Sequence, residues 1–180
     1  CFEVLYTEAE SLQHESVYAL RYPSVGATIN LMLYAVKGSN CVTLRNCAIE
    51  PEVQDVVKFL NLAGAQIVMD ATARSIQIEG VPRLLGHSYR ILYDRIQAMT
   101  YVAFAIATRQ DLVLKGICHI APIETPLSVL HLSGLSYTFQ VDEQQLIINA
   151  QSLVHLQGFK ITAEPYPLFP TDLQPIFVAL

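Results

Sequence analysis

The sequence predicts an α/β (or α+β) fold made of repeated βαβαββ units, in which sheets pack around buried helices. Three observations support this prediction. One order of helix-like and strand-like segments returns about 70 positions later. A proline near the start of a helix and a glycine just after its end return with it. Hydrophobic residues make up 52% of the chain and charged residues 15%, a composition that can bury a substantial core.

The first unit is expected to contain two helices followed by strands. In chain order its elements are a helix at 27–36, a strand at 41–45, a helix at 50–63, and paired strands at 66–69 and 75–78 with a turn at 70–74. Apolar residues recur at helical spacing in the helices and at strand-type spacing in the strands. Pro51 lies in the first turn of the second helix and Gly64 just beyond its end, the positions that these two residues favour.

The second unit is expected to repeat this order. Its elements are a helix at 98–107, a strand at 112–115, a helix at 122–133, and paired strands at 136–140 and 145–149. Pro122 and Gly134 match Pro51 and Gly64. The helix at 98–107 has apolar residues on most faces, so we expect it to be nearly enclosed.

The end of the sequence carries a further expectation. Residues 171–180 (TDLQPIFVAL) start a third unit, and Leu180 lies inside an apolar helical run that has no polar stop. Because an uncapped apolar helix end is costly to leave in water, we interpret the chain as a fragment cut from a longer polypeptide. The alternative is a complete protein with frayed ends.

Charge and hydropathy exclude several partners. The net charge is −5 and no cluster of Lys and Arg is present, so we expect neither nucleic acid nor an anionic membrane as a partner. A small anionic ligand is not excluded, since helix N-termini bind phosphate without side-chain cations. The sequence opens on no secretory signal, and its longest mainly apolar stretch, 98–107, is about half as long as a membrane span. A cytoplasmic location is therefore predicted.

Neither a metal nor a cofactor is predicted. Cys1, Cys41, Cys47 and Cys118 form no CxxC pair, and no histidine spacing completes a metal site. We expect buried or half-buried thiols rather than disulfides. The five histidines are scattered, and no Ser-His-Asp order, P-loop or dinucleotide fingerprint occurs.

The first candidate site is the segment YPSVGAT at 22–28. Ser24 precedes a helix and is suited to cap it, and the backbone at Gly26 can approach a ligand closely. The free N–H groups and the positive helix end would suit a pyrophosphate. The alternative is an ordinary helix start, because serine caps are common.

The second candidate site is the segment YPLFPTDLQ at 166–174. Its prolines stiffen the approach to a helix that begins near Thr171. Local sequence favours Thr171 or Asp172 as the cap of that helix. A carboxylate fixed on a rigid turn is also suited to act as a general base or to accept a hydrogen bond from a sugar hydroxyl.

The third candidate site is formed by Asp94 and Arg95, at the matching place in the second unit. One interpretation is an ion network, in which these residues pair with each other or with Glu50 and Glu52. The other is a catalytic role. The residues alone leave both open.

Five strings carry a family resemblance, and they occur in the order SVGATINLMLYAV, NCAIEPEVQDVVKFLNLAGAQI, IEGVPRLLG, DRIQAMTYVAFAIAT and PYPLFPTDLQ. With them the chain resembles the UDP-N-acetylglucosamine 1-carboxyvinyltransferases of the enolpyruvyl transferase family over nearly its whole length. The shikimate-pathway transferases share that fold but not the FPTD turn. The resemblance implies two domains, each of three βαβαββ copies, with the active site in the cleft between them. Residues 1–93 would then end one domain and residues 94–180 would begin the other.

The resemblance also implies roles for single residues. Asp172 matches the aspartate that contacts the sugar 3-hydroxyl and serves as the base. Tyr22 falls where many members carry a lysine for the nucleotide anion, and the adjacent Arg21 is the candidate substitute for that lysine. The implied substrate-binding residues are Tyr22, Pro23, Ser24, Val25, Gly26, Thr171 and Asp172. The implied cleft residues are Asp94, Arg95 and Glu50.

The implied reaction transfers the enolpyruvyl group of phosphoenolpyruvate to the 3-hydroxyl of UDP-N-acetylglucosamine, an early step of peptidoglycan synthesis, without a cofactor. The family's loop acid and the lysine, asparagine and arginines that handle phosphoenolpyruvate fall outside this segment. None of the four cysteines occupies the loop position. We therefore expect little or no activity from the chain alone.

Two other functions compete with this one. The tyrosine at position 22 favours a non-catalytic paralogue or sugar-nucleotide-binding module of the same fold. A shikimate-pathway transferase or a terminal phosphate cyclase is the third hypothesis, and the FPTD turn argues against it. In each case the absent units would leave apolar faces uncovered, which predicts self-association.

Overall fold

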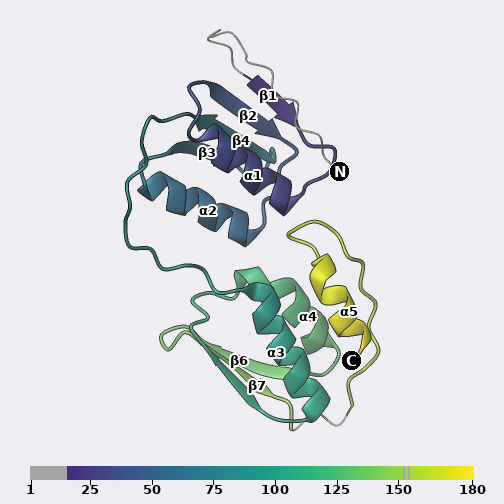
Figure 1. The fold of residues 1–180 in the computed structure, drawn as a ribbon. Helices are drawn as coiled ribbons and strands as arrows, with labels where there is room; N and C mark the ends of the chain where they lie inside the picture. Colours follow the sequence, from purple (N-terminus) through teal and green to yellow (C-terminus); the bar gives the residue numbers. More distant parts are fainter. Residues whose placement is uncertain (1–15, 152, 154) are drawn as a thin grey trace. The chain divides into compact units, whose positions relative to one another are not determined.

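The computed structural model describes residues 16–151, 153 and 155–180. The chain divides into two compact units. The first comprises Cys1–Ala48, of which the part from Ser16 is described, together with Val56–Ser88. The second comprises Ile49–Asp55 and Tyr89–Leu180. Figure 1 draws the chain from purple at its start to yellow at its end.

The first unit contains one complete βαβαββ repeat (Figure 1). Its elements are β1 (Ser16–Ala19), α1 (Val25–Ala35), β2 (Cys41–Arg45), α2 (Pro51–Leu62), β3 (Gln66–Asp70) and β4 (Ser75–Glu79). The sheet has the order β1-β2-β4-β3, with β1 parallel to β2 and the other neighbours antiparallel. Helix α1 makes the crossover that a parallel pair requires. The start of α2, up to Asp55, groups with the second unit.

The core of the first unit lies between its sheet and α1. Alternation along β4 buries Ile76 and Ile78 and exposes Gln77, as expected for a strand with one covered face. Helix α1 packs on β2 and β4 and contributes Met32, which is fully buried. The predicted strand and helix patterns are therefore confirmed in this unit, with boundaries within two residues.

The second unit repeats the order without its first strand. Its elements are α3 (Arg95–Thr108), β5 (Leu112–Lys115), a 3₁₀ turn η1 (Ala121–Ile123), α4 (Glu124–Leu132), β6 (Ser136–Gln140), β7 (Gln145–Asn149), a second 3₁₀ turn η2 (Thr171–Leu173) and α5 (Gln174–Val178). The sheet order β5-β7-β6 corresponds to β2-β4-β3, and all its neighbours are antiparallel. The predicted elements of this unit are confirmed in their order, and no described strand corresponds to β1.

The segment before α3 hydrogen-bonds to a side chain of α2 instead of to a neighbouring strand. Asp55 of α2 accepts a hydrogen bond from the Tyr89 hydroxyl at Oδ1 (2.7 Å) and one from the Leu92 N–H at Oδ2 (3.2 Å). A backbone N–H that is satisfied by a side chain does not need a strand ladder. Residues 89–92 therefore run as an irregular segment tied to α2.

The repeat is also visible in backbone conformation. Three pairs of residues about 70 positions apart have positive φ angles, namely Asn46 and Gly116, Gly64 and Gly134, and Arg74 and Gln144. The middle pair follows α2 and α4, where φ is 98° and 109°, a conformation that glycine adopts without strain. The third pair lies in the two hairpin turns. Both units thus use the same turn geometry, with the same residue at the middle pair and different residues at the other two.

The predicted helix at 122–133 is interrupted in the structure. It consists of η1 and α4, with the break at Ile123, whose φ and ψ are −118° and 4°. Pro126 has no N–H to donate to the carbonyl of Pro122, and its ring would clash with that carbonyl in a continuous α-helix. The helix therefore restarts at Glu124, so that Pro126 falls in its first turn.

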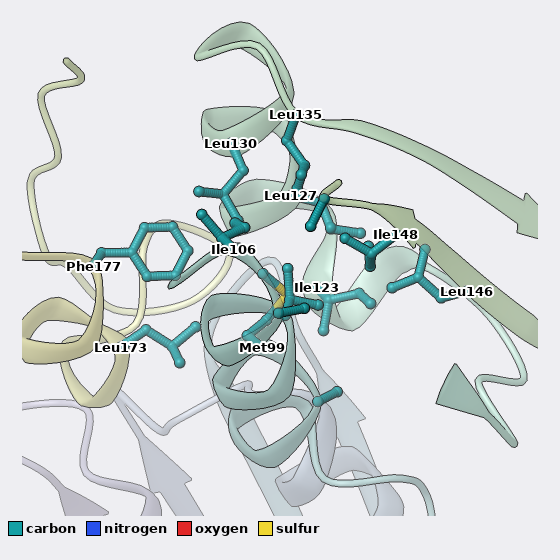
Figure 2. Packing of buried hydrophobic residues seen from close by; sticks show 14 of the residues in the cluster. Met99, Ile106, Ile123, Leu127, Leu130, Leu135, Leu146, Ile148, Leu173 and Phe177 are labelled. Carbon is teal, nitrogen blue, oxygen red and sulfur yellow. The ribbon is translucent and has the colours of Figure 1, made fainter. Parts of the chain in front are cut away.

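The core of the second unit is built from α3, α4, α5 and β7 (Figure 2). Met99 of α3 lies near Ile123, and Leu146 and Ile148 of β7 close the cluster from the sheet side. Phe177 of α5 packs edge-on against Phe169, with the ring centroids 4.9 Å apart. Residues 163–180 are thereby attached to the same core as α3.

Helix α3 is only partly enclosed, which corrects the prediction for 98–107. Ala98, Met99 and Val102 are buried. Tyr101 and Phe104, on another face, are 51% and 63% exposed. A single three-stranded sheet covers one side of this helix, so its second apolar stripe remains accessible to solvent.

A close backbone approach in the first unit makes a testable prediction about Gly80. Val81 N–H donates to the Val36 carbonyl (2.9 Å), and a Cβ at Gly80 would overlap the Gly38 carbonyl group. We expect Gly80→Ala to lower the free energy of unfolding of the 180-residue chain by about 1–3 kcal/mol, as overpacking does. Urea denaturation followed by circular dichroism would measure this.

Gly86→Ala is the matched control, since a Cβ there would meet no atom within 4 Å. Its stability should equal that of the unsubstituted chain or slightly exceed it, because alanine restricts the unfolded state. Equal losses in the two variants would contradict the close approach at Gly80.

Candidate functional site

The start of α1 is a partly exposed, positively polarised helix end. Ser24 is its N-cap, and its Oγ accepts a hydrogen bond from the Ala27 N–H (3.3 Å), so the predicted cap is confirmed. The N–H groups of Val25 and Gly26 have no intrahelical acceptor, because they belong to the first turn. A Cβ at Gly26 would meet no described atom within 4 Å. Backbone donors here can therefore reach a ligand anion.

Neighbouring contacts hold this helix start in place. Thr28 is fully buried, and its Oγ1 accepts a hydrogen bond from the Ala48 N–H (3.1 Å). Asn46 donates from Nδ2 to the Leu20 carbonyl (2.8 Å), which ties the residues before Ser24 to the end of β2. Tyr22 is 61% exposed, and Arg21 beside it is exposed as well. The side chains of Tyr22 and Arg21 are thus both accessible to solvent.

The start of α3 is the equivalent place in the second unit, but its cap is charged. Asp94 is the N-cap, and its Oδ1 accepts hydrogen bonds from the N–H groups of Ile96 (2.8 Å) and Gln97 (3.0 Å). The carboxylate satisfies those donors and compensates the positive helix end. Of the two equivalent helix starts, only the one with the neutral Ser24 cap retains its attraction for a ligand anion.

Arg95, the first residue of α3, forms a side-on ion pair with Glu52 of α2. Its Nε donates to Oε2 (3.1 Å) and its Nη2 to Oε1 (3.0 Å). Arg95 is 8% exposed. The predicted ion network therefore forms through Arg95 and Glu52, whereas Asp94 acts as a cap and Glu50 joins neither interaction.

Glu50 and two tyrosines complete this charged cluster. Glu50 is buried, and its Oε2 accepts no hydrogen bond from the described residues. The Arg95 guanidinium carbon lies 5.8 Å from the centroid of the Tyr166 ring. Burial raises the pKa of Tyr166; Arg95 lowers it, whereas Glu124, Glu52 and Glu50 raise it further. Burial also raises the pKa of Tyr93, whose hydroxyl donates to the His119 carbonyl (2.9 Å). Both phenols are therefore neutral at physiological pH.

The turn at Thr171 and Asp172 differs from the predicted cap. Pro170 occupies the N-cap position of η2, and no side chain caps this turn. Because Thr171 and Asp172 lie inside the turn, their side chains do not precede the N–H groups that a cap would satisfy. Asp172 is exposed, and its carboxylate accepts no hydrogen bond from the described residues. The prediction that either residue is a cap is wrong, and the carboxylate remains available for a ligand.

Several contributors to these places were not found from the sequence. Thr28 holds α1, Thr125 of α4 donates to the Pro167 carbonyl (2.8 Å), and Tyr166 contacts Arg95. Each interaction joins residues at least 20 positions apart. Local patterns carry no signal for such pairs.

The cysteines form no disulfide among the described residues. Cys47 is buried and Cys118 is half-buried, as expected, whereas Cys41 is exposed on β2 and corrects that expectation. Burial raises the pKa of the Cys47 thiol to about 11, so this thiol is protonated and unreactive at neutral pH.

Among the described residues, the His, Cys, Asp and Glu side chains form no group of three or more that could hold a metal ion. None of the described helices combines the length and the hydropathy needed to cross a bilayer.

The repeated order of helices and strands in the two units defines an α/β protein built from a duplicated unit. The chain belongs to the EPSP synthase (3-phosphoshikimate 1-carboxyvinyltransferase) family, whose sequence model matches residues 8–180. In structure it is similar to the enolpyruvyl transferase NikO from Streptomyces tendae, with a TM-score of 0.69 and 18% identity; the match covers 84% of this chain and 35% of that one. At that identity the likeness concerns the fold.

Curated relatives are more similar in sequence. The chain is 38% identical to the UDP-N-acetylglucosamine 1-carboxyvinyltransferase of Kosmotoga olearia, over 99% of this chain and 41% of the relative. It is 40% identical to UDP-N-acetylglucosamine 1-carboxyvinyltransferase 3 of Caldanaerobacter subterraneus subsp. tengcongensis, over 96% of this chain and 40% of the relative. The chain therefore spans about two fifths of the length of these relatives.

The Asp94 cap makes a prediction about the stability of the chain. Asp94→Ala should lower the free energy of unfolding of the chain by about 0.5–2 kcal/mol, because two N–H groups lose their acceptor. Asp94→Asn should retain most of that free energy, since asparagine caps about as well as aspartate. Urea denaturation measures both variants.

Asp142→Ala, in the exposed turn between β6 and β7, controls for loss of a carboxylate that caps no helix. An Asp94→Ala variant as stable as this control would contradict the cap.

Proposed function

We propose that the chain is part of an enzyme that transfers the enolpyruvyl group of phosphoenolpyruvate to the 3-hydroxyl of UDP-N-acetylglucosamine. The observation that carries this proposal is the Asp172 carboxylate, which lies on a rigid turn, is exposed and caps no helix. A carboxylate that the fold does not use can accept the proton of a sugar hydroxyl. The names of the relatives at 38% and 40% identity support UDP-N-acetylglucosamine as the sugar.

The start of α1 is proposed to hold the diphosphate of the sugar nucleotide. The N–H groups of Val25 and Gly26 point along the helix axis, and the Ser24 cap leaves the positive helix end uncompensated. Exposed Arg21 can add a cation beside Tyr22, which occupies the lysine position of the family. Asp172 and Thr171 are proposed to contact the sugar, and Asp94, Arg95 and Glu50 are proposed to lie near the substrates.

The proposed organisation is that of two incomplete domains. Residues 1–93 would be the end portion of one domain and residues 94–180 the first portion of the other. The division of compact units between Ser88 and Tyr89 supports a boundary in this region. The match to about two fifths of each relative supports the proposal that the remaining repeats are supplied by further chain.

The proposed reaction needs both a base and cations, and the described residues supply them unequally. A positioned base contributes about 10²–10⁴-fold. The developing negative charge on phosphate and carboxylate must be stabilised by cations. Arg95 of the second unit already binds Glu52 through its Nε and Nη2, so these nitrogens are occupied. We therefore propose that the chain alone has little or no transferase activity, and that the complete cytoplasmic enzyme acts early in peptidoglycan synthesis.

The second candidate function is a sugar-nucleotide-binding module without catalysis. Its specific support is Tyr22, which is 61% exposed and carries no charge at the position where the family holds an anion with lysine. Such a module would bind UDP-N-acetylglucosamine but release no phosphate from phosphoenolpyruvate. Isothermal titration together with a phosphate-release assay on the complete polypeptide distinguishes the two.

Self-association of the isolated chain is proposed from its exposed apolar side chains. Leu33 and Tyr34 of α1 and Phe104 of α3 are 47%, 73% and 63% exposed. Apolar groups accessible to this degree favour association in water.

The Asp172 assignment predicts a specific loss. In the complete polypeptide, Asp172→Asn should reduce kcat by about 10²–10⁴-fold while the sugar nucleotide still binds, because asparagine cannot accept the proton. Combining it with Thr171→Ala should abolish phosphate release. A coupled phosphate assay gives kcat, and titration gives the affinity for UDP-N-acetylglucosamine.

Asp142→Asn serves as the matched control, since it removes an exposed carboxylate from a hairpin turn. It should leave turnover unchanged. Unchanged turnover in Asp172→Asn would remove Asp172 from the mechanism.

A further inference from the structure

The loop that leads to Asp172 is closed on itself before the turn begins. The Glu164 N–H donates to the Phe169 carbonyl (3.0 Å), and the Leu168 N–H donates to the Pro165 carbonyl (3.2 Å). Ala163 and Phe169 form an isolated β-bridge, and Phe169 is buried against Phe177. The base of residues 163–169 is thus fixed to the core of the second unit.

The tip of the loop is held by two other elements. Thr125 of α4 donates from its hydroxyl to the Pro167 carbonyl (2.8 Å). On α3, the Arg95 guanidinium carbon lies 5.8 Å from the Tyr166 ring centroid, within the range of a cation–π contact. Tyr166 and Pro167 are therefore each anchored by a residue from a helix of the second unit.

Arg95 is itself immobilised, which distinguishes it from a surface cation. It is 8% exposed, and Glu52 accepts from two of its nitrogens, so the plane of the guanidinium is fixed. A cation–π contact is stronger when the cation is desolvated. The positive charge of Arg95 lowers the pKa of Tyr166, whereas the carboxylates of Glu124, Glu52 and Glu50 raise it.

We propose that Arg95 and Tyr166 are positioning residues for Asp172. The stack formed by Glu52, Arg95 and Tyr166 sets where the loop approaches Pro170, and Pro170 starts the 3₁₀ turn that presents the carboxylate. The inference rests on the proposed function for its catalytic consequence. Neither residue contacts the reacting atoms in this proposal; both act through the backbone of residues 166–172.

The variants separate the ring from its hydroxyl and from general packing. Tyr166→Phe retains the ring over Arg95, whereas Tyr166→Leu removes it. Tyr137→Leu is the matched control, since Tyr137 is a half-buried tyrosine of the same unit that packs edge-on against His131, with centroids 5.7 Å apart. Arg95→Lys retains the charge but cannot form the side-on pair with Glu52.

The first measurement is hydrogen–deuterium exchange in the 180-residue chain, followed by mass spectrometry of peptides that cover 166–173. Tyr166→Leu and Arg95→Lys should exchange faster than the unsubstituted chain in these peptides, while peptides from β6 and β7 keep their rates. Tyr166→Phe and Tyr137→Leu should match the unsubstituted chain in 166–173. Equal exchange in Tyr166→Leu and Tyr137→Leu overturns the positioning role.

The second measurement is steady-state kinetics of the complete polypeptide. Tyr166→Leu should lower kcat by about 10²-fold, the loss that a small misplacement of a catalytic group causes, with the KM for UDP-N-acetylglucosamine unchanged. Tyr166→Phe should have the kcat of the unsubstituted polypeptide. A rise in KM with unchanged kcat in Tyr166→Leu, or a kcat loss equal to that of Tyr137→Leu, overturns the catalytic consequence.

The two measurements can refute the proposed function and the positioning role independently of each other. An unsubstituted complete polypeptide that releases no phosphate refutes the proposed function, and the exchange rates still decide whether Arg95 and Tyr166 hold the turn. A faster-exchanging turn with undiminished kcat supports the anchoring and refutes its connection to Asp172.

Discussion

The buried charge of Arg95 is the constraint around which the second unit is arranged. Arg95 is 8% exposed, and its charge must have hydrogen-bonded partners, because an uncompensated buried charge costs several kcal/mol. Glu52 supplies the charge from the start of α2, and the Tyr166 ring covers the guanidinium from the 163–170 loop. These two contacts, together with the capped start of α3, fix three segments that are far apart in sequence. The 163–170 loop, which leads to the turn that bears Asp172, is one of them.

The two repeats show how one backbone unit acquires different properties through single residues. Ser24 and Asp94 cap equivalent helices with equivalent backbone geometry. The neutral hydroxyl leaves the positive end of α1 available to an anion, whereas the carboxylate of Asp94 compensates the end of α3. The adjacent residue differs as well, since Val25 is apolar and Arg95 pairs with Glu52. Equivalent positions thus become an anion-binding candidate in one unit and a structural ion pair in the other.

Sequence patterns predicted most of the elements and fewer of the contacts. Alternation in segments such as 75–79 and 145–149 gave the paired strands, because one face of each strand is covered and the other is not. The interruption at Ile123 was missed because Pro126 acts on the carbonyl four residues earlier, which apolar periodicity does not report. The hydrogen bonds from Tyr89 and Leu92 to Asp55 were also not predicted, because Asp55 lies in a different element.

The candidate site was predicted to a similar extent and for similar reasons. The Ser24 cap follows from local sequence, because a cap and its N–H donors are neighbours in the chain. The cap assigned to Asp172 failed because Pro170 takes the N-cap position. The contact between Arg95 and Tyr166 joins α3 to a distant loop, and it depends on how both pack on the core. Asp172 lies in the first turn of η2 without capping it, and its exposed carboxylate is the group that the proposal uses as a base. The same reasoning limits what the described residues can do alone: enzymes accelerate reactions by about 10⁶-fold or more, and a base supplies only about 10²–10⁴ of that. The remainder has to come from cations and substrate positioning that neither the Glu52–Arg95 pair nor the start of α1 provides by itself.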